Sequence, residues 1–156
     1  MAVIVKLEAI VEAMDLPEEW EAFLDPETGE IITVMPEDRE RFEDEDIDLE
    51  DLRDWERESF DQARRALESD TMLPLPDKFE IHEWDIMRRF SLTQEDPALR
   101  ELEHAIHRSG AFRNFRAVLQ RFGLREAWFA YRDEAVKRIA RDWLDSHRIR
   151  YVEGGD

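Results

Sequence analysis

The sequence predicts a helix-dominated α+β fold, with a small N-terminal helix plus a β-hairpin, an acidic arm and a C-terminal helical bundle. Apolar residues recur at helical spacing along most of the 156-residue chain. One pair of β-prone runs flanks a turn that contains Pro and Gly, and a run of carboxylates too dense for a packed sheet follows it. With 42% apolar residues the chain can bury a core, and its length fits a single domain.

The first predicted elements are a short helix and a hairpin. Helical spacing of apolar residues predicts a helix over residues 7–14, with Leu7, Ile10, Val11 and Met14 on one face. Two β-prone runs, residues 20–24 and 30–34, flank the sequence DPETG, in which Pro suits an early turn position and Gly a positive φ at the end. Because a lone hairpin is marginally stable in water, it must pack against a helix, pair with a third strand, for which residues 3–5 are a candidate, or pair with another chain.

The acidic arm occupies residues 37–58, which hold 13 carboxylates. Like charges directly opposite one another repel, so the middle of this run cannot form a packed strand. We expect an exposed arm that leads into a helix over residues 49–69. The predicted buried stripe of that helix is Leu52, Trp55, Phe60, Ala63 and Leu67.

The second half of the chain is predicted to be helical. The sequence LPLPDK, residues 73–78, is typical of a linker, and it separates two candidate subdomains, residues 1–73 (acidic, helix–hairpin–helix) and 77–150 (four helices). The expected helices cover residues 82–90, 97–108, 111–122 and 125–146. Asp96 is the expected N-cap of the second helix, with Pro97 at its first position. The side chains expected to face the core are Trp84, Met87 and Phe90 in the first helix and Trp128, Ala135, Ile139 and Trp143 in the last.

The net charge of −18 is distributed unevenly. Residues 1–76 hold 25 acidic and 7 basic residues, whereas residues 77–156 hold 15 of each. Within the second half, residues 104–150 carry 11 basic and 5 acidic residues. The chain therefore combines an acidic surface suited to a basic protein partner with a local basic region.

The sequence GAFRNFR, residues 110–116, alternates aromatic and guanidinium groups, a combination that stacks on bases and holds phosphates. On a helix, however, Phe112, Phe115, Leu119 and Phe122 share one face, which is ordinary core spacing, and we expect these side chains to be buried. What remains is a basic rim formed by Arg113, Arg116, Arg121, Arg125 and Arg132.

Two partners for this basic rim are open, nucleic acid and the chain's own acidic arm. Residues 37–61 hold 14 acidic and 4 basic residues, with Glu43, Asp44, Asp46 and Asp48 at their centre. The arm is covalently tethered, which raises its effective concentration and favours it over nucleic acid as the partner.

The sequence predicts no metal site and no cofactor. The run Asp44-x-Asp46-x-Asp48 resembles the start of a calcium loop, but the sixth and twelfth positions, where such a loop needs Gly and Glu, hold Leu49 and Trp55. Residues 101–107 contain one Glu-x-x-His and one His-x-x-His, and the second copy that a di-iron bundle requires is missing.

No catalytic motif stands out either, because the chain has no glycine-rich phosphate loop and no nucleophile elbow. The densest candidate is the stretch that holds Tyr131, Arg132 and Glu134, which could line a small pocket. The alternative is that Trp128 and Tyr131 belong to the core while Arg132 and Asp133 form surface ion pairs.

The N-terminal sequence and the absence of cysteine bear on location. The apolar run at the start is interrupted by Lys6 and Glu8, which is too early for a signal peptide or a membrane span. Without cysteine there is no disulfide framework. We therefore expect a cytoplasmic protein with no membrane partner.

Five stretches carry a resemblance that spans almost the whole chain. They are VKLEAIVEAM, FLDPETGEIITV, the acidic run, LPDKFEIHEWDIMRRF and GAFRNFRAVLQRFGLREAWFAYRDEAVKRIARDWL, in this order. In these stretches the chain resembles the bacterial Uncharacterised Protein Family 0158. The resemblance implies a bacterial protein with one shared architecture, and it implies no activity, cofactor or site residue.

The leading functional hypothesis is a non-catalytic interaction or regulatory module whose acidic surface binds a basic protein. The alternative is a nucleic-acid-associated protein that uses the C-terminal arginines and aromatic residues. A small enzyme with a pocket near residues 131–134 is the third. The sequence leaves the oligomeric state open and is compatible with a dimer.

Overall fold

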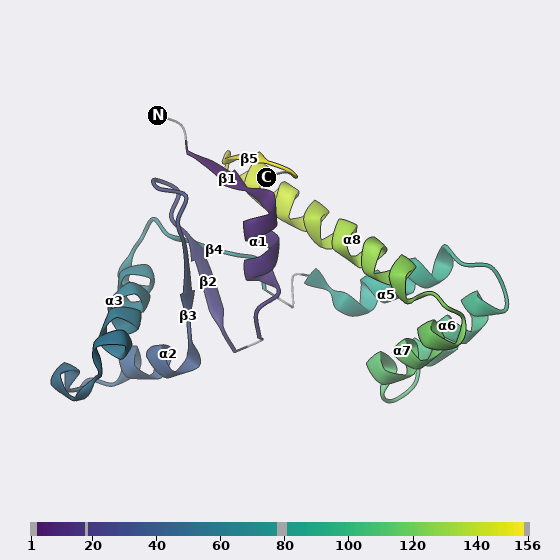
Figure 1. The fold of residues 1–156 in the computed structure, drawn as a ribbon, viewed down its shortest axis with the longest axis horizontal. Coiled ribbons are helices and arrows are strands. Elements are labelled where there is room, and N and C mark those ends of the chain that lie inside the picture. Colours follow the sequence, from purple (N-terminus) through teal and green to yellow (C-terminus); the bar gives the residue numbers. More distant parts are fainter. Residues whose placement is uncertain (1–2, 18, 78–80, 155–156) are drawn as a thin grey trace. The chain divides into compact units, whose positions relative to one another are not determined.

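The computed structural model describes residues 3–17, 19–77 and 81–154, and its helices outweigh two small sheets (Figure 1). The predicted helix-dominated α+β class is thereby confirmed. The chain divides into two compact units. We call Met1–Lys78 with Ala140–Asp156 the acidic unit, and Phe79–Ile139 the helical unit. The division falls next to the predicted linker, but the C-terminal residues return to the first unit rather than ending the second.

The larger sheet of the acidic unit has the order β3-β2-β4. The predicted hairpin is present as β2 (Glu21–Leu24) and β3 (Ile31–Val34), which pair antiparallel. Its third strand is β4 (Leu73–Pro74), on the other side of β2. The expectation that residues 3–5 supply this strand is wrong.

The hairpin turn closes on a glycine that no other residue replaces easily. The Gly29 amide donates to the Asp25 carbonyl at 2.8 Å, and Gly29 has φ +80°. A Cβ at this position would lie 2.8 Å from Cγ1 of Val3. The turn therefore needs glycine both for its backbone conformation and for its close approach to the N-terminal segment.

The N-terminal strand pairs with the far end of the chain instead. β1 (Ile4–Lys6) runs parallel to β5 (Arg150–Val152). Helix α1 (Leu7–Met14) follows β1 directly, with its predicted face buried at Leu7, Ile10 and Met14. Beyond β5, the Gly154 amide donates to Oε1 of Glu8 at 2.6 Å. Parallel strands need a long connection, and here most of the chain supplies it.

The acidic arm is more ordered than expected. Helix α2 (Pro36–Glu43) occupies its first part, and a single 3₁₀ turn (Leu49–Asp51) precedes helix α3 (Asp54–Glu68). The prediction that α3 begins near residue 49 is therefore wrong. Its start is fixed by a cap in which the Arg53 amide donates to Oε1 of Glu56 at 3.2 Å.

Helix α3 covers the sheet with the later part of its predicted stripe. Phe60, Ala63 and Ala66 are buried, and the last two form a cluster with Ile32, Val34 and Met72. Trp55, predicted to be buried, is 60% exposed. It lies in the first turn of α3, whereas the buried residues of the helix begin one turn further on.

The helical unit contains α5 (Glu83–Leu92), α6 (Ala98–Ile106), α7 (Ala111–Arg121) and the first part of α8 (Arg125–Ser146). These four helices lie where the sequence predicts them. Phe90 is central to the core, with its ring centroid 5.4 Å from those of Trp128 and Tyr131 and 6.3 Å from that of Phe115. Phe115 in turn lies 4.9 Å from Trp128. Edge-to-face aromatic contacts thus hold α5, α7 and α8 together.

Three details of the helical predictions are wrong. The α8 residues that follow Trp128 on the buried face are Val136, Ala140 and Leu144, one position after the predicted ones. Trp84 is 40% exposed, because its Nε1 reaches out to donate to the Ile106 carbonyl at 2.9 Å. The N-cap of α6 is Pro97 rather than Asp96.

The pairing of β5 also perturbs a tyrosine. Partial burial, and then the carboxylates of Asp145 and Glu153, raise the pKa of Tyr151 above 10.0. A raised folded pKa means that the stability contributed by the neutral phenol is present at neutral pH and is lost as pH rises past 10.0. Tyr151→Phe should therefore reduce the phenolate absorbance that develops above pH 10.0, and an unchanged ultraviolet titration curve would contradict this assignment.

None of the helices in the described part of the chain is long and apolar enough to cross a membrane.

Candidate functional site

The acidic segment, residues 43–51, connects α2 to α3 and exposes a row of carboxylates. Six of them form no ion pair with any described residue, and all six are exposed: Asp44, Glu45, Asp46, Asp48, Glu50 and Asp51. Two of these side chains form hydrogen bonds with the nearby backbone. Asp44 Oδ1 accepts from the Asp46 amide, and Asp48 Oδ1 accepts from the Glu50 amide, each at 3.0 Å. Among the described residues no group of three or more potential ligands is placed to hold a metal ion. The segment therefore exposes negative charge that no described residue compensates.

A buried ion network positions this segment. The Asp38 side chain in α2 is fully buried, and it accepts from Ser59 Oγ of α3 at 2.6 Å and from Arg41 at 3.0 Å. Arg41 also donates to Oε2 of Glu56 at 2.9 Å. The network ties α2 to α3 on both sides of the acidic segment, so the segment is a loop held at both ends rather than a solvated arm. Sequence reasoning missed it, because Asp38 stands among exposed carboxylates of the same type.

The charge separation coincides with the two units. The acidic unit holds 30 acidic and 11 basic residues, a net charge of −19, and the helical unit holds 10 acidic and 11 basic residues, a net charge of +1. The whole net charge of the protein therefore belongs to one unit.

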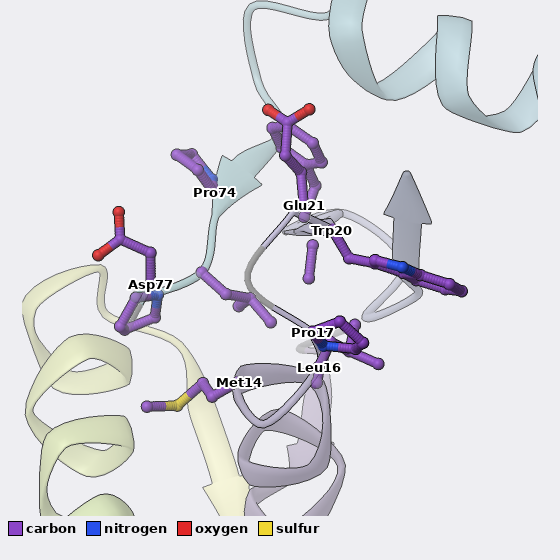
Figure 2. A pocket seen from close by; sticks show the side chains of 12 residues that line it. Met14, Leu16, Pro17, Trp20, Glu21, Pro74 and Asp77 are labelled. Atoms are coloured by element: carbon purple, nitrogen blue, oxygen red, sulfur yellow. The ribbon is translucent and has the colours of Figure 1, made fainter. Parts of the chain in front are cut away.

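The acidic unit also contains a pocket of about 230 Å³ at the end of α1 (Figure 2). Its walls are mainly apolar, and they come from α1, the loop after it, β2, β4 and the segment after β4. In Figure 2, Met14, Leu16 and Pro17 line the side of α1, and Pro74 and Asp77 the side of β4. The other lining residues are Ala13, Trp20, Glu21, Ala22, Phe23, Leu75 and Pro76. The pocket suits an apolar side chain whose neighbours are basic, because two carboxylates accompany its apolar walls.

One arginine connects this pocket to the acidic segment. Nε of Arg39 lies 3.7 Å from Oε2 of Glu21, which lines the pocket, and 3.3 Å from Oε1 of Glu43, where the acidic segment begins. These three side chains are partly exposed, so each pair contributes little to stability. Their arrangement nevertheless places a carboxylate of the pocket and the start of the acidic segment next to the same guanidinium.

The basic rim of the helical unit is only partly available. Arg121 pairs with Oε2 of Glu101 at 2.8 Å, and Arg132 pairs with Oε1 of Glu83 at 2.5 Å. Arg113, Arg116 and Arg125 are exposed and make no ion pair with a described residue. The rim therefore divides into two arginines neutralised within their own unit and three that remain accessible.

Two phenylalanines beside these arginines are exposed. Phe112, predicted to be in the core with Phe115, is 52% exposed, because it lies in the first turn of α7, before Phe115, the first buried residue of the helix. Phe129 is 56% exposed, and the Arg125 guanidinium lies 5.9 Å from the centroid of its ring. One signal for Phe129 is present in the sequence, because this residue stands outside the four-residue spacing of the predicted α8 core.

The remaining candidates are placed as follows. Glu43, Asp44, Asp46 and Asp48 belong to the acidic unit and the arginine rim to the helical unit, and contact between the two stays a prediction. Tyr131 is half-buried against Phe90, and Asp133 pairs with Lys137 at 3.1 Å. With Trp128 buried and Arg132 paired with Glu83, this stretch agrees with the alternative interpretation for Trp128, Arg132 and Asp133, while Tyr131 is only half-buried.

Comparison of the chain with protein-family models, with curated proteins and with solved structures gives no match. Membership in Uncharacterised Protein Family 0158 therefore stays a prediction based on the sequence stretches quoted above.

Proposed function

We propose that this protein is a non-catalytic interaction module whose acidic unit binds a basic protein partner. The observation that supports this function best is the row of six exposed carboxylates without ion pairs on a segment held at both ends. Elsewhere in the acidic unit, some exposed carboxylates, such as Glu30 and Asp61, are paired with arginines of the same unit.

The partner chemistry follows from the same surface. Cationic side chains, lysine or arginine, would lie along the acidic segment, and an apolar side chain next to them would enter the pocket beyond Arg39. Surface charge pairs each contribute little, so several must act together, and binding should weaken steeply with salt.

The test is capture from a nuclease-treated bacterial lysate on the immobilised full chain, with proteins eluted by salt and identified. We expect retained proteins to be basic, with a pI above about 9. The variant E43Q/D44N/D46N/D48N should retain them about tenfold less, as the loss of several cooperating charge pairs predicts.

A matched control removes the same charge elsewhere in the acidic unit. Glu12, Glu19, Glu27 and Glu68 are exposed, and none forms an ion pair with a described residue. E12Q/E19Q/E27Q/E68Q should retain the basic proteins within about twofold of the parent. These four carboxylates are scattered along the chain rather than clustered, and the loss of scattered surface charges weakens binding little. Equal losses in both variants, or a retained set that is not basic, would refute the proposal.

A further inference from the structure

The exposed face of α7 combines an aromatic ring with unpaired cations. Phe112 and Arg116 are four residues apart and therefore neighbours on the helix, and Nε of Arg116 lies 3.4 Å from the Phe112 carbonyl. Arg113 and Gln120 lie on the same side of the helix and are exposed. Phe115, Val118 and Leu119 of the same helix are buried and anchor it to its unit.

The surroundings of this face are positively charged. Residues 108–125 contain five arginines and no carboxylate. Helix α7 has no acidic residue in its first turn, so its positive dipole end, next to Phe112 and Arg113, is not compensated. The third accessible arginine of the rim, Arg125, is also next to an exposed ring, that of Phe129.

We propose that α7 and the first turn of α8 form a binding site for single-stranded nucleic acid. The bases stack on Phe112 and Phe129, and Arg113, Arg116 and Arg125 contact the phosphates. An acidic polypeptide would form ion pairs with the arginines but would leave the two exposed rings without a stacking partner. An unpaired base, by contrast, offers a flat surface on which each ring can stack. A duplex keeps its bases stacked on one another and so cannot use the rings.

The negative charge of the acidic unit does not preclude this binding. The helical unit itself has a net charge of +1, and the three arginines of the site have no carboxylate partner among the described residues. The proposed site is independent of the partner surface in the acidic unit, so either function can fail alone.

The test measures binding of the full chain to a fluorescent single-stranded oligonucleotide of about 12 nucleotides, a length within the usual site sizes. Phe112→Leu should weaken binding about tenfold, as expected for one lost stacking contact, while Phe112→Tyr should bind like the parent. Because Phe112 is exposed, both variants should fold, and their circular dichroism and melting temperature check this.

The arginines have a different signature. R113Q/R116Q should make the slope of log K against log salt shallower by about 1.4, since each contact with a single strand contributes about 0.7. Phe112→Leu should leave that slope unchanged. The matched control is R88Q/R89Q, which removes two exposed arginines of α5 in the same unit and should change neither slope nor affinity beyond about twofold.

Three outcomes would overturn the proposal. The first is a Phe112→Leu variant that binds as well as the parent. The second is a duplex of the same length that binds as tightly as the single strand. The third is an equal loss in R88Q/R89Q, which would show that net charge alone is responsible. Displacement of the oligonucleotide by polyglutamate with no effect of Phe112→Leu would assign the surface to an acidic polypeptide instead.

Discussion

Phe115→Ala is expected to lower the free energy of unfolding of the helical unit by about 3–5 kcal/mol, the usual cost of deleting a buried aromatic ring. The Phe115 side chain is 1% exposed and contacts both Phe90 and Trp128 edge-to-face. Its removal leaves a cavity where α5, α7 and α8 meet. Urea unfolding followed by circular dichroism measures the loss, and amide hydrogen exchange assigns it to residues 81–139.

Phe112→Ala is the matched control, because it deletes the same side chain three positions earlier in α7. Phe112 is 52% exposed, so its loss should cost less than about 1 kcal/mol. A large loss at Phe112, or a small one at Phe115, would show that the two rings have been assigned to the wrong faces of the helix.

Asp38→Ala should destabilise the acidic unit by about 2–4 kcal/mol. The substitution removes the acceptor of two hydrogen bonds at a fully buried side chain and leaves Arg41 and Ser59 without it. The lower end of the range applies if the Arg41 guanidinium, which is 25% exposed, forms hydrogen bonds with water in place of Asp38. Urea unfolding again measures the loss. Protection of the α2 and α3 amides from hydrogen exchange shows whether the loss is local to these two helices.

Glu37→Ala is the control for this second prediction. Glu37 is the neighbouring residue in α2 and is exposed, so its removal should change the free energy of unfolding by no more than about 0.5 kcal/mol. If the two substitutions cost the same, the Asp38 network is not what holds α2 against α3.

The parts of the fold that local sequence determines were predictable. The helices of the helical unit follow from the spacing of their apolar residues, and the hairpin follows from the DPETG turn. Which strands pair with one another was not predictable, because pairing between distant segments leaves no pattern in the local sequence. The run Ile149–Val152 is β-prone, but nothing in it points to β1. Trp55 and Phe112 show the same limit, since helical spacing indicates a face without showing how far along the helix the packing extends.

For the candidate sites, sequence reasoning found the charges but not their partners. The acidic segment and the arginine rim are both evident in the composition. Which arginines remain accessible depends on contacts such as Arg121 with Glu101, between residues twenty positions apart. The pocket of the acidic unit was missed, because its walls come from three stretches of chain that only the sheet brings together.

The pairing of β1 with β5 has a consequence for the order of events on the ribosome. Residues that meet there, such as Glu8 and Gly154, are 146 positions apart, so β1 leaves the exit tunnel roughly 10–30 s before its partner at ordinary rates of synthesis. The helical unit is one continuous stretch and can fold within that interval. The acidic unit cannot complete its fold in that interval. The apolar edge of β1 stays unpaired until β5 has been synthesised, and such an unpaired edge is a site of aggregation in nascent chains. A nascent-chain chaperone or a pause late in translation would therefore act on β1 and not on the helical unit.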